Sequence, residues 1–249
     1  SGARAERAKR VEGHPKSDND HLTQTAATIR TSLRDVADPS RAAGQQAYMR
    51  SAMPFLGVRV PDARRVARAA VPKGETSTEL LDAAADLWSR AVAREERYAA
   101  MALLGVRALR GRLELVPVIE RFTVEGRWWD LTDELAHRVS ELLDAHPAHM
   151  TTVVVDWSID RRDAPVSGAG LWLRRLAIPA PLGRGERIDR DLLTAVIDPN
   201  VDDSDFFIRK AIGWALREVA RHDPDWVVAF VDARELSPLS RREALKHVA

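Results

Sequence analysis

The chain has 249 residues, of which 45% are hydrophobic, and its 38 basic and 37 acidic residues leave a net charge of +1. This composition is typical of a globular protein and excludes one that coats nucleic acid by bulk electrostatics alone. The absence of cysteine excludes a disulfide framework, a thiolate zinc site and a cysteine nucleophile. Because no apolar run approaches the ~20 residues of a membrane span, we expect a cytoplasmic protein without membrane contact.

Two regions of the chain differ in character. Residues 1–20 are polar and without period, which predicts a mobile N-terminal tail, and residues 21–249 are predicted to form a single domain. Asp203 or Ser204 is expected to cap the helix at 203–222. The helical apolar period and the turn signals predict helices at 22–36, 40–53, 61–71, 77–89, 92–109, 112–123, 128–145, 147–157, 169–178, 187–197, 203–222, 224–233 and 238–247.

No segment alternates convincingly between apolar and polar residues, as a half-buried strand would. The one β-branched run, at 153–155, has helical flanks. We therefore predict an all-α fold. A dozen or so helices with short links favour an array of stacked helix pairs, a solenoid whose repeats are degenerate. A globular helical bundle without repeats is the alternative that the pattern leaves open.

Two residues of the predicted helix at 128–145 lie on the flank of its apolar stripe. At roughly 100° per residue, Trp129 and Asp133 fall one turn apart and outside the stripe. The stripe itself consists of Trp128, Leu131, Leu135, Val139 and Leu142.

Two breaks bracket the predicted helix at 169–178. A polar loop occupies 160–169, and Pro179 and Pro181 end the helix abruptly. These breaks are either an edge of a site or plain surface connections.

The helix predicted at 203–222 carries a second tryptophan away from its core face. Trp214 shares the side opposite the apolar stripe with Lys210, Arg217 and Arg221. An indole among cations, and another beside a carboxylate, indicate a surface that suits a flat, charged ligand. Packing of both indoles against neighbouring helices is the simpler alternative. The apolar stripe consists of Ile208, Ala211, Ile212, Ala215 and Val219.

Four segments carry recognisable motifs in a fixed order. They are Tyr-Met-Arg at 48–50 with 54–58 and 61–65, Trp-Trp-Asp-Leu-Thr-Asp at 128–133, the segment at 206–218, and the segment at 235–244. Together they resemble the AlkD-type DNA alkylation-repair glycosylases, and the likeness runs from about residue 22 to the C-terminus.

The resemblance implies a curved superhelix of HEAT-like helix pairs whose concave face holds double-stranded DNA. It implies excision of alkylated purines, such as N3-alkyladenine, N7-alkylguanine and bulkier adducts, without base flipping. Asp133 falls on the family's catalytic carboxylate, Trp129 and Trp214 on aromatic walls of the site, and Tyr48 on an aromatic of the N-terminal motif. Packing of Tyr48 near Phe55 is its alternative role.

The resemblance also implies contacts to the phosphates of DNA. Arg175 matches a phosphate-contacting arginine, although the loop before it is longer here and Pro179 and Pro181 depart from the family. Such contacts set affinity and salt dependence without sequence preference. A solvated helix face is the common alternative for each basic cluster. The other expected phosphate contacts are Lys210, Arg217, Arg241, Arg242 and Lys246.

The chemistry that the resemblance implies suits these residue types. Alkylation at N3 or N7 makes a purine cationic and a good leaving group, so no general acid is required. As the glycosidic bond lengthens, a carboxylate such as Asp133 stabilises the positive sugar and positions water. Indole faces attract cations by roughly 0.5–2 kcal/mol each. We expect no cofactor and no metal, since His146 and His149 form only a weak ligand pattern.

Two interpretations of function remain open. The first is a monofunctional alkylpurine glycosylase, because no lysine stands out as a Schiff-base nucleophile. The second is a non-catalytic HEAT-type scaffold that binds DNA or protein, although such a scaffold has no reason to retain Trp129, Asp133 and Trp214 together. An enzyme could serve general repair or self-resistance to a DNA-alkylating natural product. We expect a monomer associated with the bacterial nucleoid.

Overall fold

A computed structural model describes residues 18–160 and 168–248 of the chain. The tail predicted at 1–20 and the loop predicted at 160–169 lie almost wholly outside these residues, so both stay predictions. Within the described ranges the chain forms α-helices and two short 3-10 helices, with no strand, which confirms the predicted all-α class.

The helices account for most of the described residues. In chain order they are α1 (Asp18–Asp35), α2 (Pro39–Met49), α3 (Val60–Ala69), α4 (Ser77–Ser89), α5 (Arg94–Leu104), α6 (Leu115–Gly126), α7 (Trp129–Ala145), α8 (Pro147–Ser158), α9 (Ala169–Ala177), η1 (Gly185–Arg187), α10 (Arg190–Ile197), η2 (Asp198–Asn200), α11 (Phe206–Ala220), α12 (Pro224–Asp232) and α13 (Pro238–Ala244).

Every predicted helix occurs, and the differences lie at the ends. One of the largest concerns the helix predicted at 92–109, because α5 stops at Leu104. Gly105 follows as the C-cap, and the chain turns onward to Gly111, whose φ of 70° lies in the left-handed region. Glycine is a poor residue for a helix interior, so Gly105 favours the end of α5, and the apolar residues after Leu104 belong to turns rather than to the helix.

The N-terminus of α11 corrects the predicted cap. Asp205, and neither Asp203 nor Ser204, is the N-cap, and its carboxylate accepts a hydrogen bond from the backbone N–H of Phe207 at 2.7 Å. Asp203 instead accepts from the N–H of Asp205 at 2.8 Å. The two aspartates thus fix the direction in which the chain enters α11.

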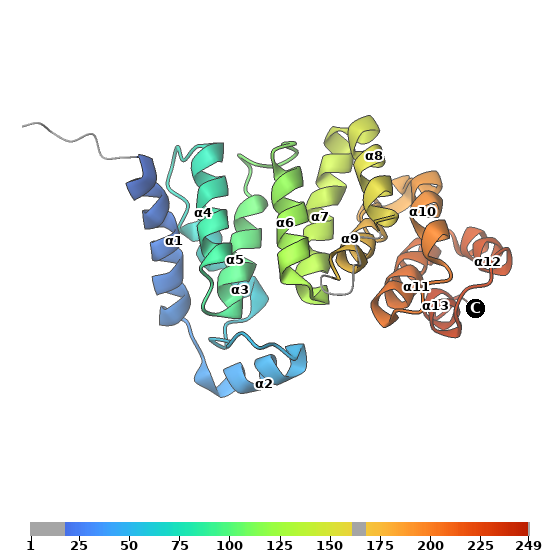
Figure 1. Cartoon of the computed structure of the whole chain (residues 1–249), viewed down its shortest axis with the longest axis horizontal. Helices are drawn as coiled ribbons and strands as arrows, with labels where there is room; N and C mark the ends of the chain where they lie inside the picture. Colours follow the sequence, from blue (N-terminus) through green and yellow to red (C-terminus); the bar gives the residue numbers. More distant parts are fainter. Residues whose placement is uncertain (1–17, 161–167, 249) are drawn as a thin grey trace, which may run out of the picture.

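The helices stand side by side in one row, with α1 near one end and α12 and α13 near the other (Figure 1). Neighbours pack against each other along this row: α4 against α1 and α5, α7 against α6 and α8, and α9 against α8 and α11. Helix α2 differs, because it lies across the lower end of the row in this view. A row of packed helices is the solenoid arrangement that the sequence predicts.

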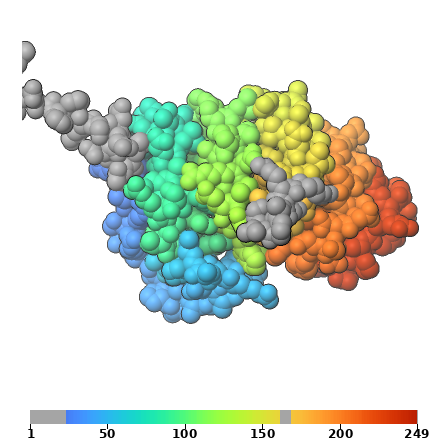
Figure 2. Space-filling model, in the orientation of Figure 1, coloured from blue at the N-terminus to red at the C-terminus, as the bar shows by residue number. Residues whose placement is uncertain are grey.

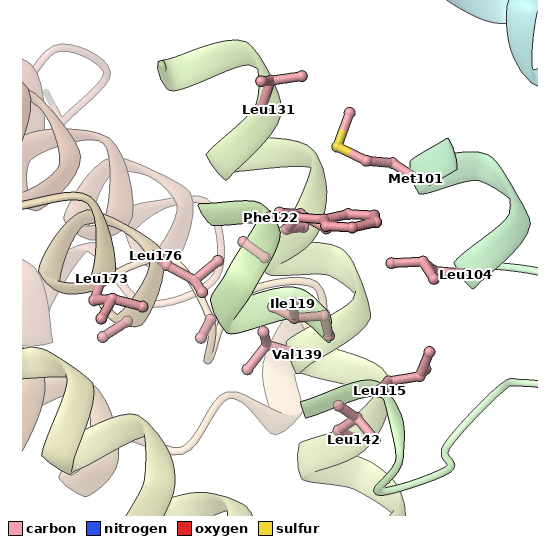
Figure 3. Close-up of a cluster of buried hydrophobic side chains, with 14 of the residues drawn as sticks. Met101, Leu104, Leu115, Ile119, Phe122, Leu131, Val139, Leu142, Leu173 and Leu176 are labelled. Atoms are coloured by element: carbon pink, nitrogen blue, oxygen red, sulfur yellow. The ribbon is translucent and has the colours of Figure 1, made fainter. Parts of the chain in front are cut away.

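The core extends along the row without interruption. Figure 3 shows Met101 and Leu104 of α5 on one side of Phe122 of α6, and Leu173 and Leu176 of α9 on the other. All five side chains are buried. Each such side chain contributes roughly 1.5–3 kcal/mol when it is removed from water. This packing holds α7 and α9 rigidly in place, and both helices carry residues predicted for the site.

A buried carboxylate anchors the segment that follows α2. Glu95 of α5 has no exposed surface, and its carboxylate accepts from the backbone N–H groups of Leu56, Gly57 and Val58 at 2.9–3.0 Å. The φ of Gly57 is 83°, and a Cβ atom there would lie 1.9 Å from the carbonyl oxygen of Asp38, just before α2. Glycine is therefore required at this position, and α2 packs against a fixed loop.

Candidate active site

A groove of about 870 Å³ lies where α2, α7, α9 and α11 approach each other. In the space-filling view, the lower outline recedes between the light-blue segment that contains α2 and the orange helices around α11 (Figure 2). Six of the eleven residues that line the groove are aromatic. The lining residues are Tyr48, Arg50, Trp128, Trp129, Asp133, Arg175, Phe206, Phe207, Lys210, Trp214 and Arg217.

Seven of the ten residues predicted for the site meet in this groove, namely Tyr48, Trp129, Asp133, Arg175, Lys210, Trp214 and Arg217. The other three, Arg241, Arg242 and Lys246, do not line it. They are exposed residues in and after α13, and Arg241 pairs with Asp232 at 2.8 Å. Their contact with phosphates stays a prediction.

Trp128 belongs to the groove rather than to the core stripe of α7, where the sequence places it. It is the N-cap residue, with an extended φ of −151°, so its side chain does not follow the helical stripe. Its ring centroid lies 5.4 Å from that of Phe207 and 6.2 Å from that of Trp172. The other stripe members are fully buried, namely Leu131, Leu135, Val139 and Leu142.

The two phenylalanines that begin α11 also line the groove, a role that the sequence pattern alone did not predict for them. The rings of Phe206 and Phe207 meet nearly edge to face, with centroids 5.5 Å apart. Phe206 is 53% exposed. Two adjacent aromatics at a helix start are a usable signal, because a helix can bury only one of two neighbouring side chains in the same core.

Tyr48 lies against Trp129 across the groove and not against Phe55. The rings of Tyr48 and Trp129 meet edge to face with centroids 6.2 Å apart, and Tyr48 remains 73% exposed. Phe55 instead packs on Tyr98. Of the two roles considered for Tyr48, the structure therefore favours a place in the groove.

Asp133 and Arg175 form a two-pronged ion pair in the wall of the groove. Arg175 Nε donates to Asp133 Oδ1 at 3.1 Å, and Arg175 Nη2 donates to Oδ2 at 2.8 Å. Arg175 Nη1 donates to the carbonyl oxygen of Phe207 at 2.7 Å. This arginine is buried, so its fork fixes the orientation of the carboxylate. The phosphate contact expected of Arg175 stays a prediction.

The environment of Asp133 disfavours its ionised form. Burial raises the pKa of the Asp133 carboxyl above the ordinary 3.8, although the positive charge and hydrogen bonds of Arg175 act in the opposite direction. The nearby Asp130 raises this pKa further. A carboxylate of this kind is poorly hydrated and therefore interacts strongly with a positive charge placed in the groove.

A carboxylate that the sequence did not single out neutralises the cations of α11. Glu243 of α13 pairs with Lys210 at 2.8 Å and with Arg217 at 2.5 Å, and Lys210 in particular lowers the pKa of Glu243. The approach of α13 depends on Gly213, because a Cβ there would lie 2.5 Å from the Glu243 Cβ. Lys210 and Arg217 are thus held toward the groove in fixed positions.

A buried network fixes the first turn of α7. Asp130 accepts from Arg94 Nη2 at 2.5 Å and from the hydroxyl of Tyr98 at 2.6 Å. Burial raises the pKa of the Tyr98 phenol, and the charge of Asp130 adds to this shift. The phenol therefore stays protonated as a hydrogen-bond donor. Because Asp130 follows Trp129 directly, the network also holds that indole at the groove.

The described part of the chain contains neither a candidate metal site nor a candidate membrane-spanning helix. No three His, Asp or Glu side chains there converge in a way that could hold a metal ion. None of the described helices combines the length and the apolarity needed to cross a membrane.

Solved structures and one protein family resemble the chain. It matches a predicted DNA alkylation repair enzyme from Enterococcus faecalis with a TM-score of 0.72 and 26% identity, covering 86% of this chain and 97% of that one. It also matches the alkylpurine DNA glycosylase AlkC of Pseudomonas fluorescens, bound to DNA containing an abasic site analog, with a TM-score of 0.51 and 17% identity. That likeness concerns the fold and covers 91% of this chain and 62% of AlkC.

No curated protein sequence matches the chain significantly. The family described as DNA alkylation repair enzyme matches residues 29–248, which is most of the chain. The fold match to the solved structure from Enterococcus faecalis likewise extends over nearly the whole of that protein. The chain therefore belongs to the DNA alkylation repair enzyme family.

Proposed function

We propose that this protein is an AlkD-type DNA glycosylase that hydrolyses the N-glycosidic bond of cationic alkylpurines in double-stranded DNA. The observation that carries the proposal is the position of Asp133, a partly buried and oriented carboxylate in a groove with six aromatic rings. Family membership supplies the biological setting. The named activity of AlkC, an alkylpurine DNA glycosylase, is consistent with the reaction class.

The reaction follows from the charge of the substrate. An N3-alkyladenine or N7-alkylguanine leaves as a neutral base when the bond between C1′ and nitrogen breaks, because it takes the bonding electrons with it. Positive charge then develops on the deoxyribose. Asp133 stabilises this charge and positions the water whose oxygen bonds to C1′ and whose proton is released. The product is an abasic site in an intact strand.

Arg175 is a positioning residue in this scheme. Its guanidinium donates hydrogen bonds to both carboxylate oxygens of Asp133 and a third to the backbone carbonyl oxygen of Phe207. A carboxylate fixed in advance needs no reorganisation when charge develops on the sugar. The positive charge of Arg175 also opposes the rise in the pKa of Asp133 that burial causes, and so favours the ionised carboxylate.

The aromatic rings give the groove its preference for cationic lesions. The faces of Trp129 and Trp214 attract a positively charged base and the positively charged sugar, whereas a neutral base gains less. Tyr48 and Phe206 extend this aromatic lining at exposed positions. We propose that the base is not flipped into an enclosed pocket, because the groove is bounded by separate helices that leave it open.

The size of the groove extends the proposed substrates to bulky adducts. Its volume of about 870 Å³ lies near the upper end of the ~300–1,000 Å³ range of small-molecule sites. A flat polycyclic adduct could stack on several of the six aromatic rings at once. We therefore include bulky N3-adenine adducts among the proposed substrates. General repair and self-resistance to a DNA-alkylating natural product both stay open as the biological role.

The test of the proposal is base release from duplex DNA that contains N7-methylguanine. We expect the wild type to release the free base and to leave a strand that breaks only after alkali treatment, as a monofunctional hydrolase would. Tight binding of the same duplex without base release over hours would favour the scaffold interpretation instead. Spontaneous depurination of the duplex without protein is the control.

A further inference from the structure

A second pocket, of about 330 Å³, adjoins the aromatic groove. It lies between the end of α2, the start of α5 and the end of α6. Arg50 and Trp128 line both pockets, so the two share a wall. Among the described residues, no acidic side chain lines the second pocket, whereas four arginines do, namely Arg50, Arg94, Arg97 and Arg127. Of these, Arg94 is paired with Asp130. We call it the arginine pocket.

Arg97 lies half-buried in the arginine pocket, and no carboxylate of the described residues forms an ion pair with it. Its guanidinium stacks on the ring of Trp88 at 4.6 Å, and its Nε atom is buried without a hydrogen-bond acceptor. The two carboxylates that act on it electrostatically are engaged elsewhere. Asp130 binds Arg94 and Tyr98, and Glu125 binds Trp88 and Arg121.

The charge of Arg97 is therefore only partly compensated, by the ring of Trp88 and by the more distant Glu125 and Asp130. Burial lowers its pKa below the ordinary 12.5, and the like charge of Arg94 lowers it further. Buried polar groups are nearly always hydrogen-bonded, and buried charges are nearly always paired. An anion in the arginine pocket would supply the missing partner.

The backbone at two of the other arginines, Arg50 and Arg127, is strained. Among the described residues, Arg50 and Arg127 are the only non-glycine residues with a positive φ, at 49° and 45°. Both are C-cap residues, a position at which glycine or asparagine normally adopts this conformation. Left-handed backbone at residues with long side chains is concentrated at functional sites. Here both strained residues bring a guanidinium to one pocket.

We propose that the arginine pocket binds a backbone phosphate of the DNA strand whose damaged base lies in the aromatic groove. This proposal rests on the proposed function. Successive bases rise only about 3.4 Å along a strand, so a strand that places its lesion in the groove passes the adjoining pocket. The planar fork of arginine matches the oxygens of a phosphate, and the pocket is large enough to hold one.

Binding of a duplex that contains a tetrahydrofuran abasic-site analogue tests the proposal without turnover. In Arg97→Met the side chain keeps its apolar stem and loses its charge. We expect three- to tenfold weaker binding, with a slope of log K against log salt that is smaller by about 0.9, as for one lost phosphate contact. Arg107→Met is the matched control, because Arg107 is exposed beyond the other end of α5 and forms no ion pair among the described residues.

Arg50→Asn provides a second variant that does not depend on how Arg97→Met folds. Asparagine adopts the left-handed conformation readily, so this substitution removes the cation without disturbing the C-cap. Thermal unfolding of both variants checks their integrity. We expect the same reduction in salt slope for Arg50→Asn.

Neutral methylphosphonates locate the phosphate. Placed one at a time along the damaged strand, they should weaken wild-type binding at one position next to the lesion, and that loss should vanish in Arg97→Met.

Wild-type affinity and salt slope in folded Arg97→Met and Arg50→Asn would overturn the proposal. If base release fails while the arginine variants lose salt-linked binding, the glycosylase proposal falls and the phosphate site stands. If base release occurs while these variants bind DNA like the wild type, the glycosylase proposal stands and the phosphate site falls.

Discussion

At the scale of single residues, the chemistry of the groove depends on a carboxylate that is neither fully buried nor fully solvated. Trp129 and Asp133 could be predicted because they lie on the flank of an apolar stripe. The ion pair of Asp133 with Arg175 could not, since 42 residues separate the two and no local pattern links them. Glu243 escaped prediction for the same reason, because the close approach of α13 to α11 brings it to Lys210 and Arg217.

The opposing effects on Asp133 predict a characteristic pH dependence. Asp133 must be ionised to stabilise the sugar, so the single-turnover rate falls as the pH falls through its pKa. Burial raises this pKa above the ordinary 3.8, so the acidic limb of the profile should lie above that value. Removing the opposing cation in Arg175→Met should move the limb to higher pH.

Rates measured at saturating enzyme separate this effect from DNA binding. Arg138→Met is the control, because Arg138 lies on α7, pairs with Glu141 and does not line the groove. Its limb should coincide with that of the wild type. An unshifted limb in Arg175→Met would mean that Asp133 does not set the pH dependence.

At the scale of elements, the apolar period determines where the helices form, and the way the helices pack against each other forms the groove. All helix positions could be predicted because each apolar stripe is read from its own segment. The crosswise orientation of α2 could not be predicted, because it depends on long-range hydrogen bonds between Glu95 and the loop at 56–58. Trp128 was misassigned because it precedes the first helical residue of α7, where the helical period does not apply.

The contact that holds α2 in place predicts unequal losses of stability for two similar glycine substitutions. Gly57 and Gly74 have φ values of 83° and 87°, so alanine at either position adopts a left-handed backbone at a cost of roughly 1–2 kcal/mol. A Cβ atom at Gly74 meets nothing within 4 Å, whereas at Gly57 it meets the carbonyl oxygen of Asp38. Gly57→Ala should therefore lower the free energy of unfolding by about 2 kcal/mol more than Gly74→Ala does.

Chemical denaturation measures both free energies of unfolding. Gly57→Ala should also reduce base release more than Gly74→Ala, because the clash displaces the start of α2 and with it Tyr48. Equal destabilisation by the two substitutions would show that α2 is not held by this contact.

At the scale of the whole molecule, the charge is nearly balanced, yet its distribution is uneven. A net charge of +1 predicts weak bulk attraction to DNA. Binding is therefore expected to depend on the few cations at the groove and in the arginine pocket. The sequence could indicate basic clusters but not the arginine pocket, whose residues come from three elements and include two strained C-caps. The monomeric state stays a prediction.

The central claim is that Asp133 carries out the chemistry of the groove. Its most direct test is the single-turnover rate of N7-methylguanine release by Asp133→Asn, compared with the wild type at saturating enzyme. Asparagine keeps the shape and loses the charge, so the rate should fall by about 10²–10³ while the affinity for abasic-analogue DNA changes little. An Asp133→Asn protein that releases the base as fast as the wild type would contradict the account.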